Sequence, residues 1–185
     1  MSVYQWDFKK ALDEFTMCLD IRKKHLGERH LLVAQSYNNI GLVYQRRAEY
    51  QKSIEYYQKA LEIYLSIFGE QHPHVGILYN NIGYSCFLLG DNHVALKNYC
   101  QSIKLKKQVL RNYDMNMAIT CNHMGNLFSE NSDLKEAMSQ HKQSLLIYFK
   151  LFGMDHQKIW SLKDKIITWE KKMTLNSQYY DLGNL

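Results

Sequence analysis

The sequence predicts an all-α protein made of repeated helix pairs, and three observations lead to this prediction. Motifs recur along the 185-residue chain at a fixed spacing of forty-two residues. Apolar residues follow one another at steps of three and four, which is the spacing that lines one face of a helix. One proline and nine glycines are too few for the frequent turns of a protein built from short strands.

The repeat is clearest in a five-residue motif. Tyr-Asn-Asn-Ile-Gly occupies residues 37–41 and again 79–83, and an altered copy, Cys-Asn-His-Met-Gly, occupies residues 121–125. Two further series keep the same period, one of small residues and one of mostly aromatic residues. The first is Ala11, Ser53, Ala95 and Ala137, and the second is Phe15, Tyr57, Tyr99 and His141. Such a period is typical of a solenoid, in which stacked repeats share one core.

Each repeat is predicted to contain two helices. The first lies at about residues 33–47, with Tyr37, Ile40 and Tyr44 on one face, and the second at about residues 50–68. Gly41 and its counterparts lie inside first helices, where glycine costs about 1 kcal/mol relative to alanine. Their recurrence therefore predicts that the paired helices approach each other closely.

Turn residues separate the predicted helices. Gly69 is placed to end a second helix with left-handed backbone, and Pro73 suits the first turn of the next helix, where its missing N–H costs nothing. Asp91 and Asp133 are placed to accept N–H groups at helix starts. Three histidines also obey the period and are predicted to share a structural role at the turn. They are His30, His72 and His156.

The phase of the repeat divides the chain. We expect a half repeat at 7–27, repeats at 28–69, 70–111 and 112–153, a capping helix at 157–173 and an unstructured polar tail at 174–185. The second full repeat lacks its terminal glycine, so an irregular connection is expected there. The capping helix should turn four apolar residues inward and four lysines outward. These are Ile159, Leu162, Ile166 and Trp169, and Lys163, Lys165, Lys171 and Lys172.

The opening half repeat is a second helix whose first helix would precede Met1. Trp6, Phe8 and Phe15 would then present part of an apolar face to solvent. Terminal repeats normally have a polar outer surface, so this edge predicts self-association, a fragment of a longer solenoid, or an irregular cap formed by residues 1–5.

These motifs resemble the tetratricopeptide repeat, in the forty-two-residue form found in kinesin light chains. The resemblance rests on Asn-Asn-Ile-Gly-x-x-Tyr at 38–44, Tyr-Gln-Lys-Ala-Leu-Glu-Ile-Tyr at 57–64 and Gly-Glu-Gln-His-Pro at 69–73, and covers roughly residues 7–172. It implies a right-handed α-solenoid of antiparallel helix pairs, with about three and a half repeats plus a C-terminal cap. It also implies a non-catalytic cytoplasmic scaffold, with a link to cargo or to kinesin heavy chain. The heptad coiled coil that joins the family to the heavy chain is absent from these residues.

The resemblance also implies a concave groove that binds a peptide segment of a partner through the repeated asparagines. A carboxamide has both a donor and an acceptor, so a row of them can bracket an extended backbone. The predicted groove residues are Asn38, Asn39, Asn80, Asn81 and Asn122, with His123 as a sixth, and Gln35, Arg46, Tyr84 and Asn126 on the same side by helical spacing. Alternatively, the asparagines bond to neighbouring helices and fix the stacking. One of each pair would then be structural while its neighbour faces the groove.

Charge gives weaker guidance. The net charge of +5 comes from lysines interleaved with acids, so nucleic-acid binding is permitted and not indicated. Arg46, Arg47 and Lys52 add positive charge near the first repeat's turn. Such a run is more often a solvated face, and if it is functional it favours acidic peptides.

No constellation for catalysis, no phosphate-binding loop and no cofactor motif is found. His72 and His74, with Glu70 nearby, are a weak metal candidate. The four cysteines are interpreted as small apolar residues. No run approaches the ~18 apolar residues of a membrane span, and no signal peptide opens the chain, so neither membrane insertion nor export is expected. The rivals to a peptide-binding scaffold are an assembly module and a small hydrolase or metal-binding protein.

Overall fold

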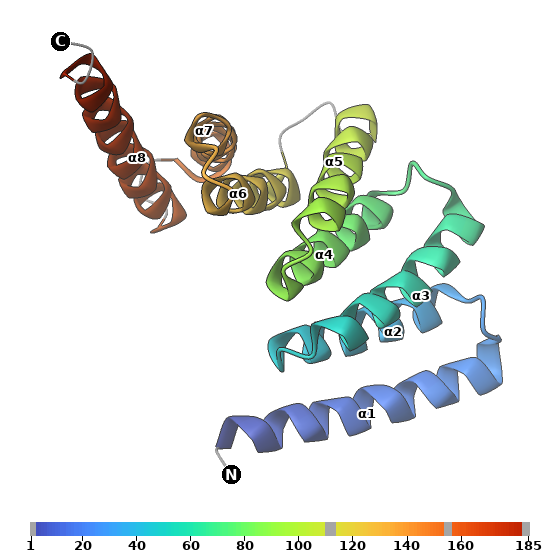
Figure 1. Cartoon of the computed structure of the whole chain (residues 1–185). Helices are drawn as coiled ribbons and strands as arrows, with labels where there is room; N and C mark the ends of the chain where they lie inside the picture. Colours follow the sequence, from blue (N-terminus) through green and yellow to red (C-terminus); the bar gives the residue numbers. More distant parts are fainter. Residues whose placement is uncertain (1–2, 110–113, 154–156, 183–185) are drawn as a thin grey trace. The chain divides into compact units, whose positions relative to one another are not determined.

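Eight helices make up the part of the chain that the computed structural model describes, namely residues 3–109, 114–153 and 157–182 (Figure 1). Side chains are described for residues 8–105, 114–153 and 157–171. No strand occurs within these ranges. The helices are α1 (Val3–Leu26), α2 (Leu31–Arg46), α3 (Tyr50–Phe68), α4 (Pro73–Leu89), α5 (Asn92–Val109), α6 (Met115–Glu130), α7 (Leu134–Phe152) and α8 (Gln157–Leu182).

The helices form two compact units. The N-terminal unit, Met1–Val109, contains α1 to α5, and the C-terminal unit, Leu110–Leu185, contains α6 to α8. Within each unit every helix packs against the next along the chain, and the pairs α2/α3, α4/α5 and α6/α7 correspond to the predicted repeats. The predicted all-α fold of helix pairs is therefore confirmed.

Local signals at the helix ends behave as predicted. The second helix of the first repeat is α3, with the predicted bounds, and α4 begins at Pro73. Gly69 has a φ of 71° and ends α3. Asp91 Oδ1 accepts from the Val94 N–H at 3.1 Å, and Asp133 Oδ1 accepts from the Glu136 N–H at 3.2 Å.

The periodic histidines cap helices. His30 Nδ1 accepts from the Leu32 N–H at 3.1 Å at the start of α2, and His72 Nδ1 accepts from the His74 N–H at 3.2 Å at the start of α4. His156 and the predicted irregular connection at 110–113 lie outside the described residues. At the start of α6 an unpredicted cap is present, because Asp114 Oδ1 accepts from the Met117 N–H at 2.6 Å.

The recurring glycines and aromatic residues meet in the core. A Cβ atom on Gly41 would lie 2.8 Å from Tyr57 Cδ1, and one on Gly83 would lie 2.8 Å from Tyr99 Cδ1. In the C-terminal unit a Cβ on Gly125 would lie 2.5 Å from a nitrogen of His141. All three ring side chains are fully buried. The predicted close approach of paired helices is confirmed, and the aromatic series explains it, because each ring lies on the bare backbone of a glycine.

Hydroxyl groups add a second link within the pairs. Ser102 Oγ of α5 donates to the Gly76 carbonyl of α4 at 2.6 Å, and Ser144 Oγ of α7 donates to the Ala118 carbonyl of α6 at 2.7 Å. The acceptor positions are small residues, so the helices come close enough for a short side chain to reach the backbone.

Tyr57→Phe is expected to stabilise the N-terminal unit by about 1 kcal/mol. The Tyr57 hydroxyl is buried and makes no hydrogen bond to any described residue, and burial raises the pKa of this phenol well above its ordinary range. Urea unfolding followed by circular dichroism measures the change. Tyr148→Phe is the matched control, because the Tyr148 hydroxyl accepts from Lys158 Nζ at 3.3 Å. A loss of stability in Tyr57→Phe equal to that in Tyr148→Phe would contradict the assignment of an unpaired hydroxyl.

The last helix differs from its prediction in two ways. Ile159, Leu162 and Ile166 are buried as expected, but Lys165 turns inward, where it is half-buried and donates to Asn126 Oδ1 of α6 at 3.0 Å. The prediction that Lys165 points outward was wrong, because a carboxamide on the facing helix provides an acceptor. In addition, α8 continues to Leu182, so residues 174–182 of the expected tail are helical. No glycine or proline interrupts the sequence between 157 and 182.

The opening helix presents an apolar surface that includes residues not named from the sequence. Phe8 and Phe15 are half-buried, and the side chain of Trp6 lies outside those described. Met17 and Ile21, one helical turn apart, are 67% and 50% exposed. These two residues of α1 are therefore more exposed than Phe8 and Phe15.

Candidate functional site

A small pocket lies between α2 and α4 in the N-terminal unit. Its volume is about 240 Å³. From α2 it is lined by Gln35, Asn38 and Asn39, which are all predicted groove residues. The remaining lining residues are Tyr64 of α3 and His74, Ile77 and Leu78 of α4. Three of the predicted side chains are thus brought together, because residues 35, 38 and 39 lie on one face of a single helix.

The pocket combines amide groups with an apolar wall. The three carboxamides supply donors and acceptors, Ile77 and Leu78 supply apolar surface, and no lining residue is an acid, a lysine or an arginine. Its chemistry is therefore suited to a neutral backbone amide with an apolar side chain beside it.

Stacked rings close one end of the pocket. The ring centroids of Tyr64 and His74 lie 5.1 Å apart, with 5° between the ring planes. The ring centroids of His72 and Phe68 lie 4.3 Å apart. Burial raises the pKa of Tyr64, and its hydrogen bond with Gln35 acts in the opposite direction. Burial and then the neighbouring His74 lower the pKa of His72, which keeps its Nδ1 available as a helix cap. The ring cluster thus fixes both the start of α4 and one wall of the pocket.

Gln45, which was not among the predicted residues, ties α2 to α4. Its Nε2 donates to Ser85 Oγ at 2.8 Å and lies 3.4 Å from the Asn81 carbonyl oxygen. Ser53 Oγ of α3 lies 2.8 Å from the same Ser85 hydroxyl. This network joins α2, α3 and α4.

The other predicted residues of this unit lie outside the pocket. Asn80 is buried, with 7% of its surface exposed, whereas Asn81 is half-buried. Tyr84 is half-buried and lies 6.4 Å from Phe87 between ring centroids. Arg46 is exposed at the end of α2, where its charge favours the ionised form of Tyr57.

The three remaining predicted residues belong to the C-terminal unit. Asn122 and His123 are half-buried on α6, and the Asn122 side-chain oxygen accepts no hydrogen bond from a described residue. Asn126 accepts from Lys165, so its oxygen is engaged within the unit. Burial lowers the pKa of Lys165. These three residues and the pocket belong to different units.

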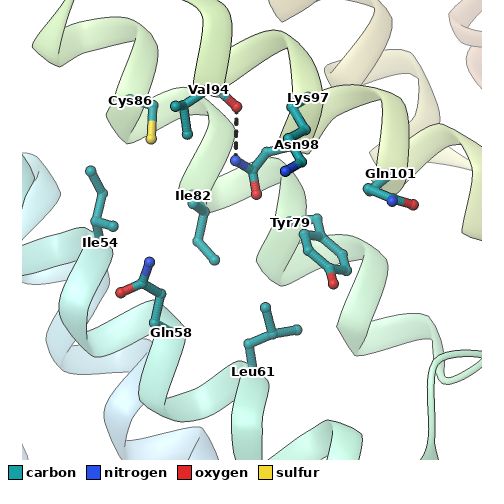
Figure 2. Close-up of a pocket in the computed structure, with 10 residues that line it drawn as sticks. All are labelled: Ile54, Gln58, Leu61, Tyr79, Ile82, Cys86, Val94, Lys97, Asn98 and Gln101. Atoms are coloured by element: carbon teal, nitrogen blue, oxygen red, sulfur yellow. Dashed lines mark hydrogen bonds between the residues drawn. The ribbon is translucent and has the colours of Figure 1, made fainter. Parts of the chain in front are cut away.

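A second, larger pocket of about 390 Å³ was not predicted (Figure 2). Figure 2 shows apolar side chains from α3 and α4, among them Ile54, Leu61 and Ile82, with amide side chains around them. Lys97 of α5 is its only lysine, and Asn98 Nδ2 donates to the Val94 carbonyl at 2.8 Å. No lining residue is shared with the first pocket, so variants here can serve as controls for binding there.

Some lining residues could have been found from the repeat. Ile77 lies forty-two residues after Gln35, so the period places both on equivalent faces of α2 and α4. Tyr64 and His74 carry no such signal, because their contact depends on how α3 leads into α4.

Among the described residues, no three His, Cys, Asp or Glu side chains are grouped as metal ligands would be. None of the described helices combines the length and the apolar character that a membrane span requires.

Comparison with known proteins gives a consistent result. A family model described as the tetratricopeptide repeat matches residues 3–66 and 32–108. No curated protein sequence matches the chain significantly. The crystal structure of BtubC (BKLC) from P. vanneervenii is similar, with a TM-score of 0.80, 22% identity, and coverage of 91% of this chain and 67% of that one.

Two further solved structures share the fold. The putative kinesin light chain repeats of P. anserina have a TM-score of 0.74 and 14% identity, and the match covers 98% of this chain and 86% of that one. The N-terminal domain of stress-induced protein-1 from C. elegans has a TM-score of 0.57 and 18% identity, covering 76% and 96%. The expected resemblance is confirmed by the family match and by these folds. This chain belongs to the tetratricopeptide repeat family.

Proposed function

We propose that this protein is a non-catalytic interaction scaffold that binds an extended segment of a partner protein in the pocket between α2 and α4. The observation that carries the proposal is the convergence of Gln35, Asn38 and Asn39 on one pocket, opposite the apolar Ile77. Peptide or protein binding is also the general role of tetratricopeptide repeats, which supports the class of function.

The geometry favours recognition of a peptide over recognition of a metabolite. Pockets for drug-sized ligands usually span about 300–1,000 Å³, and a pocket of about 240 Å³ is closer in size to a single side chain. The carboxamides bond to the peptide backbone of the partner, while one apolar side chain packs against Ile77 and Leu78. Such a contact is expected to give micromolar affinity, about −8 kcal/mol.

A preference for acidic segments is the finer part of this proposal. Of the basic residues Arg46, Arg47 and Lys52, two already form ion pairs. Arg47 and Lys52 both contact Glu49, at 2.8 and 2.7 Å. Arg46 therefore remains as the candidate for attracting an acidic residue of the partner. A role as a kinesin light chain-like cargo adaptor, or a link to kinesin heavy chain, rests on the family resemblance, and the identity of the captured partner tests it.

Self-association through α1 is the second candidate function. It is favoured by Met17 and Ile21, which are adjacent on one face of α1 and at least half exposed. Replacing both by serine should then weaken association of the full chain without affecting peptide capture. Unchanged association in that double variant would exclude α1 as the contact.

The peptide proposal predicts a specific loss of binding. Peptides are selected from a display library on the full chain, and their affinities are measured by fluorescence anisotropy. Asn39→Ala and Asn38→Ala should each weaken the selected peptides at least tenfold, because each removes a donor and an acceptor from the pocket. Gln58→Ala is the matched control, since this exposed amide lines the second pocket. Circular dichroism should show equal helix content in all variants. If Asn38→Ala and Asn39→Ala bind as the unmodified chain does, the proposal fails.

A further inference from the structure

The C-terminal helix α8 follows the repeat period and corresponds to the first helix of a repeat, as α2, α4 and α6 do. Its buried residues Ile159 and Ile166 lie a whole number of repeats, eighty-four residues, after Val75 and Ile82 of α4. All four are buried. The buried residues of α8 thus occupy the same repeat positions as those of α4. The exposed residues of α8 can therefore be aligned with their equivalents in α4 by the same spacing.

In α2, α4 and α6, the face that packs against the second helix of the same repeat has small residues at two positions. One place is occupied by Ala34, Gly76 and Ala118, and the other by Gly41, Gly83 and Gly125. At the first place Ser102 and Ser144 reach the carbonyls of Gly76 and Ala118, and at the second a buried ring lies on each glycine. Small residues at both places are therefore required for the close pairing of helices.

In α8 both places have large apolar residues. Trp160 stands at the first and Ile167 at the second, and they are 61% and 50% exposed. At the second place even a Cβ atom would lie 2.5–2.8 Å from the ring of a second helix packed in the observed geometry. A further helix pair of the repeat type therefore cannot form on α8. This also excludes the α1 helix of another copy as the occupant, because its Phe15 would meet Ile167.

We propose that the Trp160/Ile167 face of α8 pairs with the same face of α8 in a second copy, with the two helices antiparallel. Helical spacing places Lys163 and Asp164, which have opposite charges, on the same face between the two apolar positions. When Trp160 of one copy faces Ile167 of the other, the antiparallel register also places Lys163 opposite Asp164. Both contacts occur twice, so the sequence from 160 to 167 is complementary to itself, as a two-fold interface requires.

The local structure supports this pairing. Lys163 Nζ lies 5.3 Å from the centroid of the Trp160 ring, and Asp164 is exposed one turn after Trp160. Parallel helices in the same register would place Lys163 against Lys163 and Asp164 against Asp164, which is repulsive. The large side chains suit an ordinary interhelical distance of about 8–10 Å, in contrast to the closer glycine-mediated pairs. Two single helices bury a small interface, so we expect affinity in the micromolar range.

Sedimentation velocity of the full chain, from about 1 to 200 µM, tests the proposal. A reversible shift from monomer to dimer is expected, and Trp160→Ala combined with Ile167→Ala should weaken dimerisation at least tenfold. Leu146→Ala is the control, because Leu146 on α7 is similarly exposed, at 47%. A two-fold contact closes at the dimer, whereas a head-to-tail contact gives longer oligomers. A chain that stays monomeric throughout, or a Trp160→Ala and Ile167→Ala double variant that associates as the unmodified chain does, would overturn the proposal.

Charge reversal tests the register itself. Lys163→Asp alone should weaken the dimer, because each new aspartate faces Asp164 of the other copy, and Asp164→Lys alone should weaken it for the corresponding reason. The double variant exchanges the two charges and should recover dimerisation, and an equimolar mixture of the two single variants should form a heterodimer. Circular dichroism confirms that each variant is folded. If both single variants dimerise normally, or if the double variant remains as weak as they are, the antiparallel register is wrong.

Discussion

Gly83→Val is expected to destabilise the N-terminal unit by about 3 kcal/mol. A Cβ atom at this position would lie 2.8 Å from Tyr99 Cδ1 and 3.1 Å from the carbonyl oxygen of Ala95. The ring is fully buried and the carbonyl is backbone, so neither can move away at low cost. Gly83→Ala should also destabilise, although alanine inside a helix normally gains about 1 kcal/mol over glycine. Urea unfolding followed by circular dichroism at the helix band measures both changes.

Gly69→Ala separates this steric effect from backbone strain. Gly69 has a φ of 71°, and a Cβ atom there would meet nothing within 4 Å. The expected cost is about 1–3 kcal/mol from backbone strain alone, because a positive φ with a ψ of −173° is essentially restricted to glycine. If Gly83→Ala increased stability as an ordinary helix substitution does, the close approach of α4 and α5 would be contradicted.

Acidification from pH 6.5 to pH 4 is expected to remove about 3 kcal/mol of stability from the C-terminal unit through His141. This side chain is fully buried, and neither ring nitrogen has a hydrogen-bond partner among the described residues. Burial, and then the positive charge of Lys165, lowers the pKa of His141 from 6.5 to about 4. The unfolded chain therefore binds a proton below about pH 6.5, whereas the folded chain does not until about pH 4, so the free energy of unfolding falls across this interval.

His141→Phe should remove that pH dependence while keeping a ring on Gly125. The substitution follows the repeat, which has Phe15, Tyr57 and Tyr99 at the equivalent positions. Urea unfolding at pH 7 and pH 4.5 can be followed by tryptophan fluorescence, because Trp169 lies 4.8 Å from His141 between ring centroids. His93→Gln, which replaces an exposed histidine of the other unit, is the control. Equal acid losses in His141→Phe and in the unmodified chain would show that other groups cause the destabilisation.

The sequence predicted those features that depend on one helix or on one period. The bounds of α3 were predicted correctly because Gly69 ends the helix by a local conformational preference. Gln35, Asn38 and Asn39 line one pocket for a similar reason, since helical spacing alone places them on one face. Tyr64 and His74 were not found, because their meeting depends on the angle at which α4 leaves α3 and no residue pattern encodes that angle directly.

Carrying roles from one repeat to the next fails where the surroundings differ. Asn38 lines the pocket, whereas Asn80, at the same place of the next repeat, is buried. Asn126 bonds to Lys165 of α8, and its counterparts at 42 and 84 are leucine and tyrosine, which cannot form that bond. Lys165 points inward for the same reason, whereas it was expected to point outward. The amphipathic pattern of α8 contains no information about the Asn126 acceptor on α6.

The most direct test of peptide binding between α2 and α4 is an NMR titration of the full chain with a peptide selected from the display library. Backbone amides and the carboxamide side chains report on both pockets in one experiment. Binding at this site predicts that the largest shifts occur at Asn38, at Asn39 and at residues 74–78, with small changes at the second pocket. If the largest shifts instead fall at residues 94–101, with none on α2, the partner binds elsewhere and the proposed site is wrong.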